Sequence, residues 1–383
     1  MNNKNEAFEP NRLLCIVSSM DRGGAETFLM KIYREIDKAK YQMDFAVTAP
    51  GAYDDEIRSM GGKIYHIPAK SKNPIKTFIE LKKIVNDNGY KSVLRTSQQS
   101  LATLDLVAAK CGGAKKLIYR SSNAGMTEKG IHKVINKAFS FLPKCIPNVK
   151  LAPSTEAAEF VFGKKAVKNK KVTIMPNGLD YSLFEFDEIK REKIRKELGL
   201  ENKHIIGHVG RFNQQKNHKF LIDIFNEIHK KDNNAHLLLI GKGELENEIR
   251  DKIERLELDK FVTIIAPVAN INEYYMAMDV FVFPSFFEGM PNVIIEAQAT
   301  GLPCYVSNTI TKEANITGIV KYIELEETSK KWANLILKNR NVNRNRFLQR
   351  SRKLLKTPKW KKRRRNPNNT NGFLQKRLSP SNR

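Results

Sequence analysis

The sequence predicts an α/β protein with two doubly wound parallel-sheet domains that face each other across a cleft. The chain has 383 residues, of which 41% are apolar, and this is enough for two separate cores. Short apolar runs alternate with segments of helical periodicity, as in parallel sheets with right-handed crossovers. The alternation occurs twice, before and after a charged segment of helical pattern at residues 186–203.

The first half opens on an expected strand at residues 12–18, RLLCIVS, an apolar run typical of a strand buried on both faces. A turn at Gly23 and Gly24 and a helical pattern at residues 27–33 follow. Further strands are expected at residues 43–48, 63–67, 91–95, 116–120 and 149–152, with helices between most of them, including 75–87 and 100–110.

The second half repeats this scheme from a strand at residues 205–209. We expect helices at residues 217–230, 244–255, 271–278, 291–300 and 329–338, and strands at 235–240, 261–265, 280–284, 303–306 and 319–324. We therefore divide the chain into a polar segment 1–11, a first domain 12–185, a connector 186–203, a second domain 204–339 and a tail 340–383.

The formal net charge of +26 is concentrated in two segments. Residues 340–383 contain sixteen Lys or Arg and no Asp or Glu, and residues 110–171 contain fourteen basic and three acidic residues. The remaining chain is close to neutral. Charge therefore gives no reason to treat the whole protein as a nucleic-acid or membrane binder.

The basic tail at residues 340–383 allows three interpretations. It is an arm that binds nucleic acid or membranes, a disordered solvated tail, or the product of a shifted reading frame. We favour the shifted frame, because a long stretch without acids begins abruptly after ordinary sequence. Sequencing the gene downstream of codon 339 tests this: the absence of any frame that encodes an amphipathic helix would contradict it.

The sequence also indicates the cellular compartment in which we expect the protein. The polar first eleven residues predict no secretory signal, and no run approaches the roughly 18 apolar residues of a spanning helix. The cysteines lack metal-ligand or Cys-x-x-Cys spacing, so we expect buried thiols in a reducing, cytoplasmic setting. They are Cys15, Cys111, Cys145 and Cys304.

Two glutamates mark the carboxyl end of an expected strand in the second domain. Glu288 follows the apolar run 279–285, DVFVFPS, and Glu296 lies about a turn into the next helix, which Pro291 begins. Open α/β sheets bind ligands at this end of their strands, and a helix start offers free N–H groups to phosphate. Carboxylates accept hydrogen bonds from sugar or ribose hydroxyls. By itself, the pair also fits a solvated loop acid and a capping acid.

The surrounding sequence, residues 274–303, resembles the donor-sugar site of the family-four retaining glycosyltransferases. These enzymes have the GT-B fold, with two Rossmann-like domains. The resemblance extends from about residue 12 to about residue 338, with further motifs in the family's order. They are the first glycine loop at residues 20–26 (MDRGGAE), the passage toward the second domain at 176–180 (PNGLD) with Phe184, and the diphosphate clamp at 209–212 (VGRF) with Lys216 and Asn217.

The resemblance implies that a nucleotide sugar is the donor substrate and that neither a metal nor another cofactor is needed. Arg211 and Lys216 would then neutralise the diphosphate, Glu288 would hold the donor sugar, and Glu296 the ribose. We take Glu288, Arg211 and Lys216 as catalytic and expect the Arg211 guanidinium near the two acids. The implied donor-binding residues are Gly23, Gly24, Arg211, Lys216, Glu288, Gly289, Met290, Asn292, Val293 and Glu296.

The first domain, implied to be the acceptor side, departs from the family pattern. Many relatives carry a histidine there at a strand end, whereas residues 94–98 and 119–123 contain none. Arg95, Arg120 and Asn123 are the alternative acceptor-side candidates.

Residues 129–142 have apolar and basic faces at helical spacing, which fits either packing on the sheet or contact with anionic lipid. A lipid-linked acceptor would make peripheral contact with the inner face of the plasma membrane useful.

Other function classes have less support. A nucleic-acid binder would depend on the tail, and the chain shows no aromatic-basic RNA motif or zinc spacing. A nicotinamide oxidoreductase lacks Gly-x-Gly-x-x-Gly, and a kinase-like enzyme lacks the P-loop motif. A GT-B-shaped sugar-nucleotide epimerase stays an alternative. We predict transfer from a nucleotide sugar, a UDP-sugar by preference, to a glycan or lipid-linked acceptor in capsule, exopolysaccharide or related glycan assembly, with no specific nucleic-acid partner.

Overall fold

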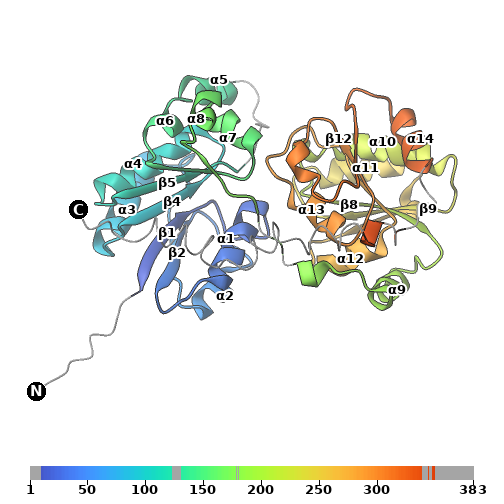
Figure 1. Cartoon of the computed structure of the whole chain (residues 1–383), viewed down its shortest axis with the longest axis horizontal. Coiled ribbons are helices and arrows are strands. Elements are labelled where there is room, and N and C mark those ends of the chain that lie inside the picture. Colours follow the sequence, from blue (N-terminus) through green and yellow to red (C-terminus); the bar gives the residue numbers. More distant parts are fainter. Residues whose placement is uncertain are drawn as a thin grey trace, which may run out of the picture. The chain divides into compact units, whose positions relative to one another are not determined.

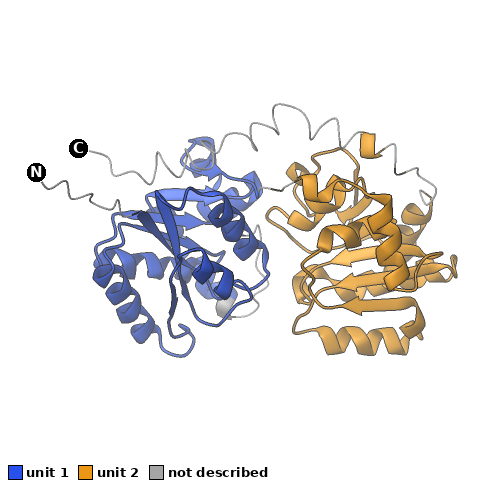
Figure 2. Ribbon diagram, turned by 90° about the horizontal axis from the view of Figure 1, so that it is seen from below, with its two compact units in different colours: residues 1–178, 362–383 blue, residues 179–361 orange. Residues whose placement is uncertain are grey.

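The computed structural model of the chain forms two compact units (Figures 1 and 2). It describes residues 10–122, 131–177, 179, 181–338, 344 and 347–349. Unit 1 comprises the described residues up to 177, and unit 2 those from 179 onward. Each unit is an α/β layer structure around one parallel sheet, so the predicted fold class is confirmed.

The sheet of unit 1 has seven strands in the order β3-β2-β1-β4-β5-β6-β7, and the paired strands are parallel. Residues in β1 alternate between two cores, with Leu14 and Ile16 in one and Leu13 and Cys15 in the other. Because both faces are buried, the strand reads as a continuous apolar run. The strands are β1 (Asn11–Ile16), β2 (Tyr41–Val47), β3 (Ile64–His66), β4 (Ser92–Thr96), β5 (Lys116–Arg120), β6 (Val149–Ala152) and β7 (Thr173–Ile174).

Helices cover both faces of this sheet (Figure 1). One core is closed by α1 (Gly24–Glu35) and α2 (Asp54–Ser59), and the other by α3 (Pro74–Asp87), α4 (Leu104–Cys111) and α7 (Thr155–Phe162). The remaining helical elements are η1 (Ser100–Thr103), α5 (Ile131–Ala138), α6 (Leu142–Cys145) and α8 (Lys164–Lys168).

Unit 2 is a six-stranded sheet in the order β10-β9-β8-β11-β12-β13, with its paired strands parallel. Its strands are β8 (His204–Val209), β9 (Ala235–Ile240), β10 (Val262–Ile265), β11 (Val280–Phe283), β12 (Cys304–Ser307) and β13 (Val320–Ile323). One face carries α12 (Ile271–Ala277) and α13 (Asn292–Ala299); the other carries α10 (His218–His229), α11 (Glu246–Arg255) and α14 (Ser329–Leu337). Short 3-10 turns lie at η2 (Tyr181–Phe184), η3 (Gln214–Lys216), η4 (Asp259–Phe261) and η5 (Lys312–Ala314).

The predicted order of strands and helices agrees with the structure, with differences at a few places. The patterns did not predict the short elements β7, α2 and α8 or the helix α7. Within the expected helix at residues 129–142, α5 ends at Ala138 and α6 begins only at Leu142, and residues 129–130 lie outside the described part of the chain.

The helix of the expected connector, α9 (Glu188–Glu197), belongs to unit 2 and packs against α12. It begins where the Asp187 carboxylate accepts hydrogen bonds from the backbone N–H groups of Ile189 (3.0 Å) and Lys190 (3.3 Å). The units therefore divide at residue 178, before the boundary expected after residue 185.

Two residues of the predicted tail pack in unit 2. Leu348 is buried, and the Arg344 guanidinium donates to four backbone carbonyls of unit 2. A side chain on Gly301, which has φ +68°, would come within 2.6 Å of Leu348 Cδ2. Residues 344 and 348 are thus part of the fold, whereas residues 350–383 lie outside the described residues.

The cysteine prediction is half right. Cys15 and Cys304 are buried in the sheets, and burial raises their thiol pKa values well above the ordinary range. Cys111 and Cys145 are exposed because they end helices α4 and α6 at the surface.

Among the described residues, no helix combines the length and the hydropathy that crossing a membrane requires.

Candidate functional site

The candidate site lies where the strand order of unit 2 reverses. From β8 the sheet continues to β9 and β10 on one side and to β11, β12 and β13 on the other. The loops that follow β8 and β11 therefore leave the sheet side by side at the carboxyl ends of the strands. This switch point is where open α/β sheets bind ligands.

The loop after β8 is shaped by its own side chains. The Asn213 side chain accepts a hydrogen bond from the Lys216 backbone N–H at 3.2 Å and so caps η3. Asn217 adopts the left-handed conformation (φ +56°) and starts α10. A Cβ on Gly210 would lie 3.3 Å from the Lys216 side chain, so glycine lets this lysine fold back over the strand end.

Lys216 is joined to Glu288 across the two loops. Its Nζ lies 2.6 Å from Glu288 Oε1, and both side chains are largely buried. Two further hydrogen bonds join the loops: the Gln215 carbonyl accepts from Phe286 N at 2.9 Å, and the Gln215 side chain donates from Nε2 to the Phe287 carbonyl at 2.8 Å. Both candidate groups therefore project from one braced pair of loops.

Arg211 has a different partner from the one we expected. Its Nη2 lies 3.2 Å from Glu244 Oε2, in the segment between β9 and α11. The two side chains are 71% and 56% exposed. The guanidinium is thus paired with this surface acid and not with Glu288 or Glu296, although an exposed pair of this kind is weak and easily exchanged.

The start of α13 supplies the remaining donor-side candidates. Pro291 is the N-cap without a side-chain cap, so Asn292 and Val293 open the helix. Gly289 and Met290 are buried just before it. One turn later, Glu296 Oε2 accepts a hydrogen bond from the Tyr275 hydroxyl at 3.2 Å. The helix start and Glu296 lie on one helix, next to the loop that carries Glu288.

Two buried histidines lie behind the loop of Lys216. The rings of His208 and His218 are 4.7 Å apart, and His208 Nδ1 lies 2.8 Å from the Val282 carbonyl oxygen. The pKa of His208 is lowered to about 3 and that of His218 to about 2, mainly by burial, with a smaller contribution from the positive charge of the nearby Lys216. Both rings are therefore neutral near pH 7, and neither is a general acid there.

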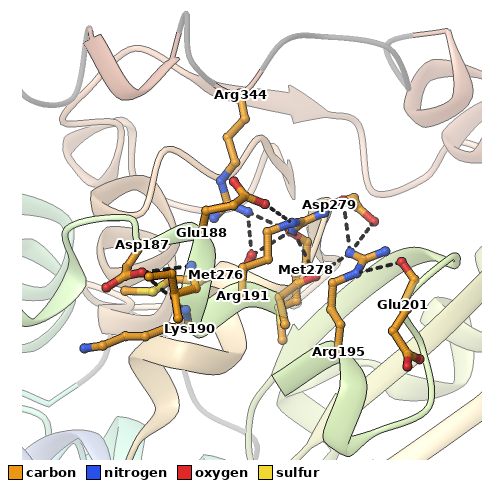
Figure 3. A network of polar contacts seen from close by, with 12 residues as sticks. Asp187, Glu188, Lys190, Arg191, Arg195, Glu201, Met276, Met278, Asp279 and Arg344 are labelled. Carbon is orange, nitrogen blue, oxygen red and sulfur yellow. Dashed lines mark hydrogen bonds and ion pairs between the residues drawn. The ribbon is translucent and has the colours of Figure 1, made fainter. Parts of the chain in front are cut away.

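A cluster of arginines binds the carboxyl end of α12 (Figure 3). Arg191 donates to the carbonyl oxygens of Met276 and Met278 at 2.8 and 3.0 Å, and Arg344 donates to the same two oxygens at 2.8 Å each. Arg191 and Arg195 also pair with Asp279, at 2.6 and 3.2 Å. Burial opposes ionisation of Asp279, but the two guanidinium groups hold its pKa below the ordinary value. The cations satisfy the free carbonyls at the helix end.

Unit 1 contains the first glycine loop and the acceptor-side candidates. Gly23 is the N-cap of α1, and Gly24 is its first residue. Arg95 Nε lies 2.9 Å from Asp105 Oδ2, and its Nη1 donates to the Ile16 carbonyl at 2.9 Å, so this arginine braces the sheet internally. Asn123 lies outside the described residues.

Arg120, at the end of β5, is only 2% exposed. Its Nη2 donates to Asn177 Oδ1 at 2.6 Å, and its guanidinium carbon lies 3.7 Å from the centre of the Phe28 ring. Burial lowers its pKa to about 9. Within the part of the chain that the structure describes, no carboxylate forms an ion pair with this guanidinium.

Sequence reasoning gave no role to Gln215, Tyr275, Asn177 and Arg344, although Asn177 lies in the motif at 176–180 and Tyr275 in the stretch 274–303. Asn213, three residues before Lys216, carried the signal of a cap. No local sequence pattern indicated the contacts of the four listed residues, because their partners are distant in the sequence. Among the described residues, no group of three or more His, Cys, Asp and Glu side chains converges as metal ligands do.

The sequence is similar to known glycosyltransferases. Residues 203–338 match the family described as Glycosyl transferases group 1. EpsF of Bacillus subtilis, named as a glycosyltransferase, is 32% identical over 85% of this chain and 86% of its own. CapH of Staphylococcus aureus, a capsular polysaccharide biosynthesis glycosyltransferase, is 28% identical over 85% and 90%. An Escherichia coli enzyme named UDP-Gal:alpha-D-GlcNAc-diphosphoundecaprenol alpha-1,3-galactosyltransferase is 28% identical over 67% of each chain.

The fold is shared with solved structures as well. HepE from Anabaena, crystallised with UDP-glucose, superposes with a TM-score of 0.76 over 96% of this chain and 99% of its own, at 18% identity. From the extent and identity of the EpsF match, together with the family match over unit 2, the chain belongs to the group 1 glycosyltransferases of the GT-B fold.

Proposed function

We propose that the protein transfers a sugar from a UDP-sugar to a glycan or lipid-linked acceptor, with retention of anomeric configuration and without a metal ion. The observation that carries the proposal is the pairing of Lys216 with Glu288 at the switch point of unit 2. A cation and a sugar-binding carboxylate beside an uncapped helix start suit a diphosphate joined to a sugar. UDP-glucose bound to HepE and the UDP-galactose named for the Escherichia coli relative support UDP as the nucleotide of the donor.

In this proposal, protein cations take the place of a metal at the leaving group. Lys216 would exchange part of its contact with Glu288 for a phosphate oxygen, and Arg211 would leave Glu244 to bind another. The backbone N–H groups of Asn292 and Val293 would add donors. Glu288 would hold sugar hydroxyls, and Glu296 the ribose. Positive charge then stabilises the diphosphate as it departs.

Retention would follow from attack on the face that the diphosphate leaves. The acceptor oxygen forms a bond to the anomeric carbon as the bond from that carbon to the phosphate oxygen breaks. The acceptor hydroxyl gives its proton to the departing phosphate, so that no protein base is needed. Analysis of the product anomer tests this step, and an inverted product would contradict it.

Arg120 is the candidate of unit 1 that we retain for the acceptor side. A buried cation with an amide as its hydrogen-bonding partner suits an anionic group, such as the phosphate of a lipid-linked acceptor. The diphosphoundecaprenol acceptor in the name of the Escherichia coli relative supports this chemistry. Arg120→Gln should then weaken acceptor use and leave UDP binding unchanged; equal loss of both would contradict it.

The surface of α5 suggests how a lipid-linked acceptor would be reached. Val134, Phe139 and Phe141 are exposed, with Lys133 and Lys137 beside them. The buried Asn136 anchors this helix, because its Oδ1 accepts from Ser100 N at 2.8 Å. Exposed apolar groups next to lysines suit anionic lipid, and we propose a peripheral, cytoplasmic position at the membrane.

Liposome flotation tests this contact. The protein should float with anionic vesicles and not with neutral ones, and Phe139→Ser/Phe141→Ser should reduce recovery. Equal recovery with both kinds of vesicle would count against it.

A donor screen tests the function itself. The melting temperature of the full chain should rise with a UDP-sugar more than with a GDP- or ADP-sugar, with or without EDTA. The shift should diminish in Glu296→Ala and in Arg211→Ala. A response limited to another base, or one abolished by EDTA, would contradict the proposed donor or the metal independence. Product analysis with the responding donor distinguishes transfer from epimerisation.

A further inference from the structure

A buried tyrosine contacts the second glutamate of the candidate site. Tyr275 is fully buried in α12, with its ring centre 6.3 Å from that of Phe184 and 5.7 Å from that of Phe281. Its hydroxyl donates to Glu296 Oε2 at 3.2 Å. Burial raises the pKa of Tyr275 well above its ordinary value, so the hydroxyl stays a donor throughout the physiological range. One oxygen of the Glu296 carboxylate is therefore held from inside the core.

The two helices that carry this pair are joined at their carboxyl ends. Arg344 donates to the Tyr275 carbonyl of α12 at 3.0 Å and to the Thr300 carbonyl after α13 at 3.0 Å. Figure 3 shows its guanidinium reaching the end of α12 beside Arg191. Because both helices are fixed to the same group, the position of the tyrosine relative to Glu296 is set by the fold.

We propose that Tyr275 is a positioning residue that orients the Glu296 carboxylate toward the ribose hydroxyls of the nucleotide. The inference rests on the proposed function, because it requires a nucleotide donor. With one oxygen held, the partly exposed Glu296 carboxylate loses less rotational freedom when it binds the ribose diol. In this proposal the Tyr275 hydroxyl contacts the Glu296 carboxylate, and the tyrosine acts on the ligand through that carboxylate.

The test compares ligands with and without the ribose hydroxyls, by calorimetric titration of the full chain. Tyr275→Phe keeps the aromatic ring and removes the hydrogen bond, so UDP should bind about fivefold more weakly. Affinity for 2′,3′-dideoxy-UDP should stay within about twofold of wild type. Glu296→Gln should show the same ligand dependence. Tyr274→Phe, on the same helix and partly exposed, is the matched control and should change neither affinity.

Each other outcome overturns a definite claim. Equal weakening of UDP and the dideoxy ligand by Tyr275→Phe would mean that the residue acts through packing. Unchanged UDP affinity would mean that its hydroxyl does not matter. If Glu296→Gln shows the ribose dependence and Tyr275→Phe does not, the inference fails and the proposed function stands. If the wild-type chain binds no UDP, both fail.

Discussion

The Nζ of Lys216 lies 2.6 Å from Oε1 of Glu288, although the two residues are 72 positions apart in the chain. The lysine also lies 4.8 Å from the centre of the Phe283 ring, at the end of β11. The pair thus bridges the two strands between which the sheet order reverses. A ligand phosphate that binds Lys216 must compete with this carboxylate.

The effects of the Lys216–Glu288 pair on stability and on UDP binding should be separable by mutation. Lys216→Met leaves Glu288 buried without its cation, and should lower the free energy of unfolding by about 3 kcal/mol. Adding Glu288→Gln removes the unpaired charge and should restore most of that stability. UDP affinity should stay at least about tenfold below wild type in both variants, because the cation is absent. Denaturant unfolding and calorimetry measure the two effects, and restored UDP binding in the double variant would contradict the phosphate role of Lys216.

Arg211 should matter for binding and not for folding. Its pair with Glu244 is exposed, so Arg211→Ala should change the free energy of unfolding by less than about 0.5 kcal/mol. UDP affinity should fall about tenfold, because a charge-assisted contact with the phosphate is lost. Glu244→Ala, the matched control, releases the arginine and should leave UDP affinity equal or higher. Arg211→Ala with wild-type affinity for UDP would remove this residue from the site.

Arg344 should be a stabilising residue of unit 2. Arg344→Ala removes the donor of the Tyr275 and Thr300 carbonyls, at the ends of α12 and α13, and should cost about 2 kcal/mol in denaturant unfolding. Arg344→Lys should not restore this stability, because an ammonium group cannot reproduce the planar fork. Lys338→Ala, exposed at the end of α14, is the control and should be near neutral. An equal, small effect of all three changes would place Arg344 outside the folded body.

The buried histidines predict that acid destabilises the protein. The folded-state pKa values of His208 and His218 are about 3 and about 2, below the ordinary value of 6.5. Between the folded-state values and pH 6.5, the unfolded chain binds more protons than the folded protein. The free energy of unfolding therefore decreases as pH falls below about 6.5. Each ring should contribute a loss of about 2 kcal/mol by pH 5, which is about 1.5 pH units below 6.5.

His218→Phe tests this linkage. The new ring keeps an aromatic contact with Phe212, whose ring centre lies 4.7 Å from that of His218. The dependence of the free energy of unfolding on pH between 7 and 5 should become shallower in the variant. An unchanged slope would mean that the His218 ring takes up its proton in the folded protein as it does in the unfolded chain.

Local sequence was sufficient for most elements of the fold. β1 and β11 are buried on both faces, so their sequences are continuous apolar runs, and the helices between strands keep their 3.6-residue period. The prediction was less accurate where local composition and long-range packing disagree. α9 is so charged that it resembled a connector, yet Arg191 and Arg195 use that charge to hold the end of α12. Arg344 lies in a basic segment that resembled a tail for the same reason.

The sequence by itself determined two wound parallel sheets, the loops that carry Arg211, Lys216 and Glu288, and the helix that carries Glu296, because periodicity, turn residues and motif spacing are local properties of the chain. Only the tertiary structure decided which groups these side chains meet. The order of β8 and β11 joins Lys216 to Glu288, and the packing of α12 beside α13 places the Tyr275 hydroxyl on Glu296. Such contacts depend on strand order and helix packing, which no short stretch of sequence encodes.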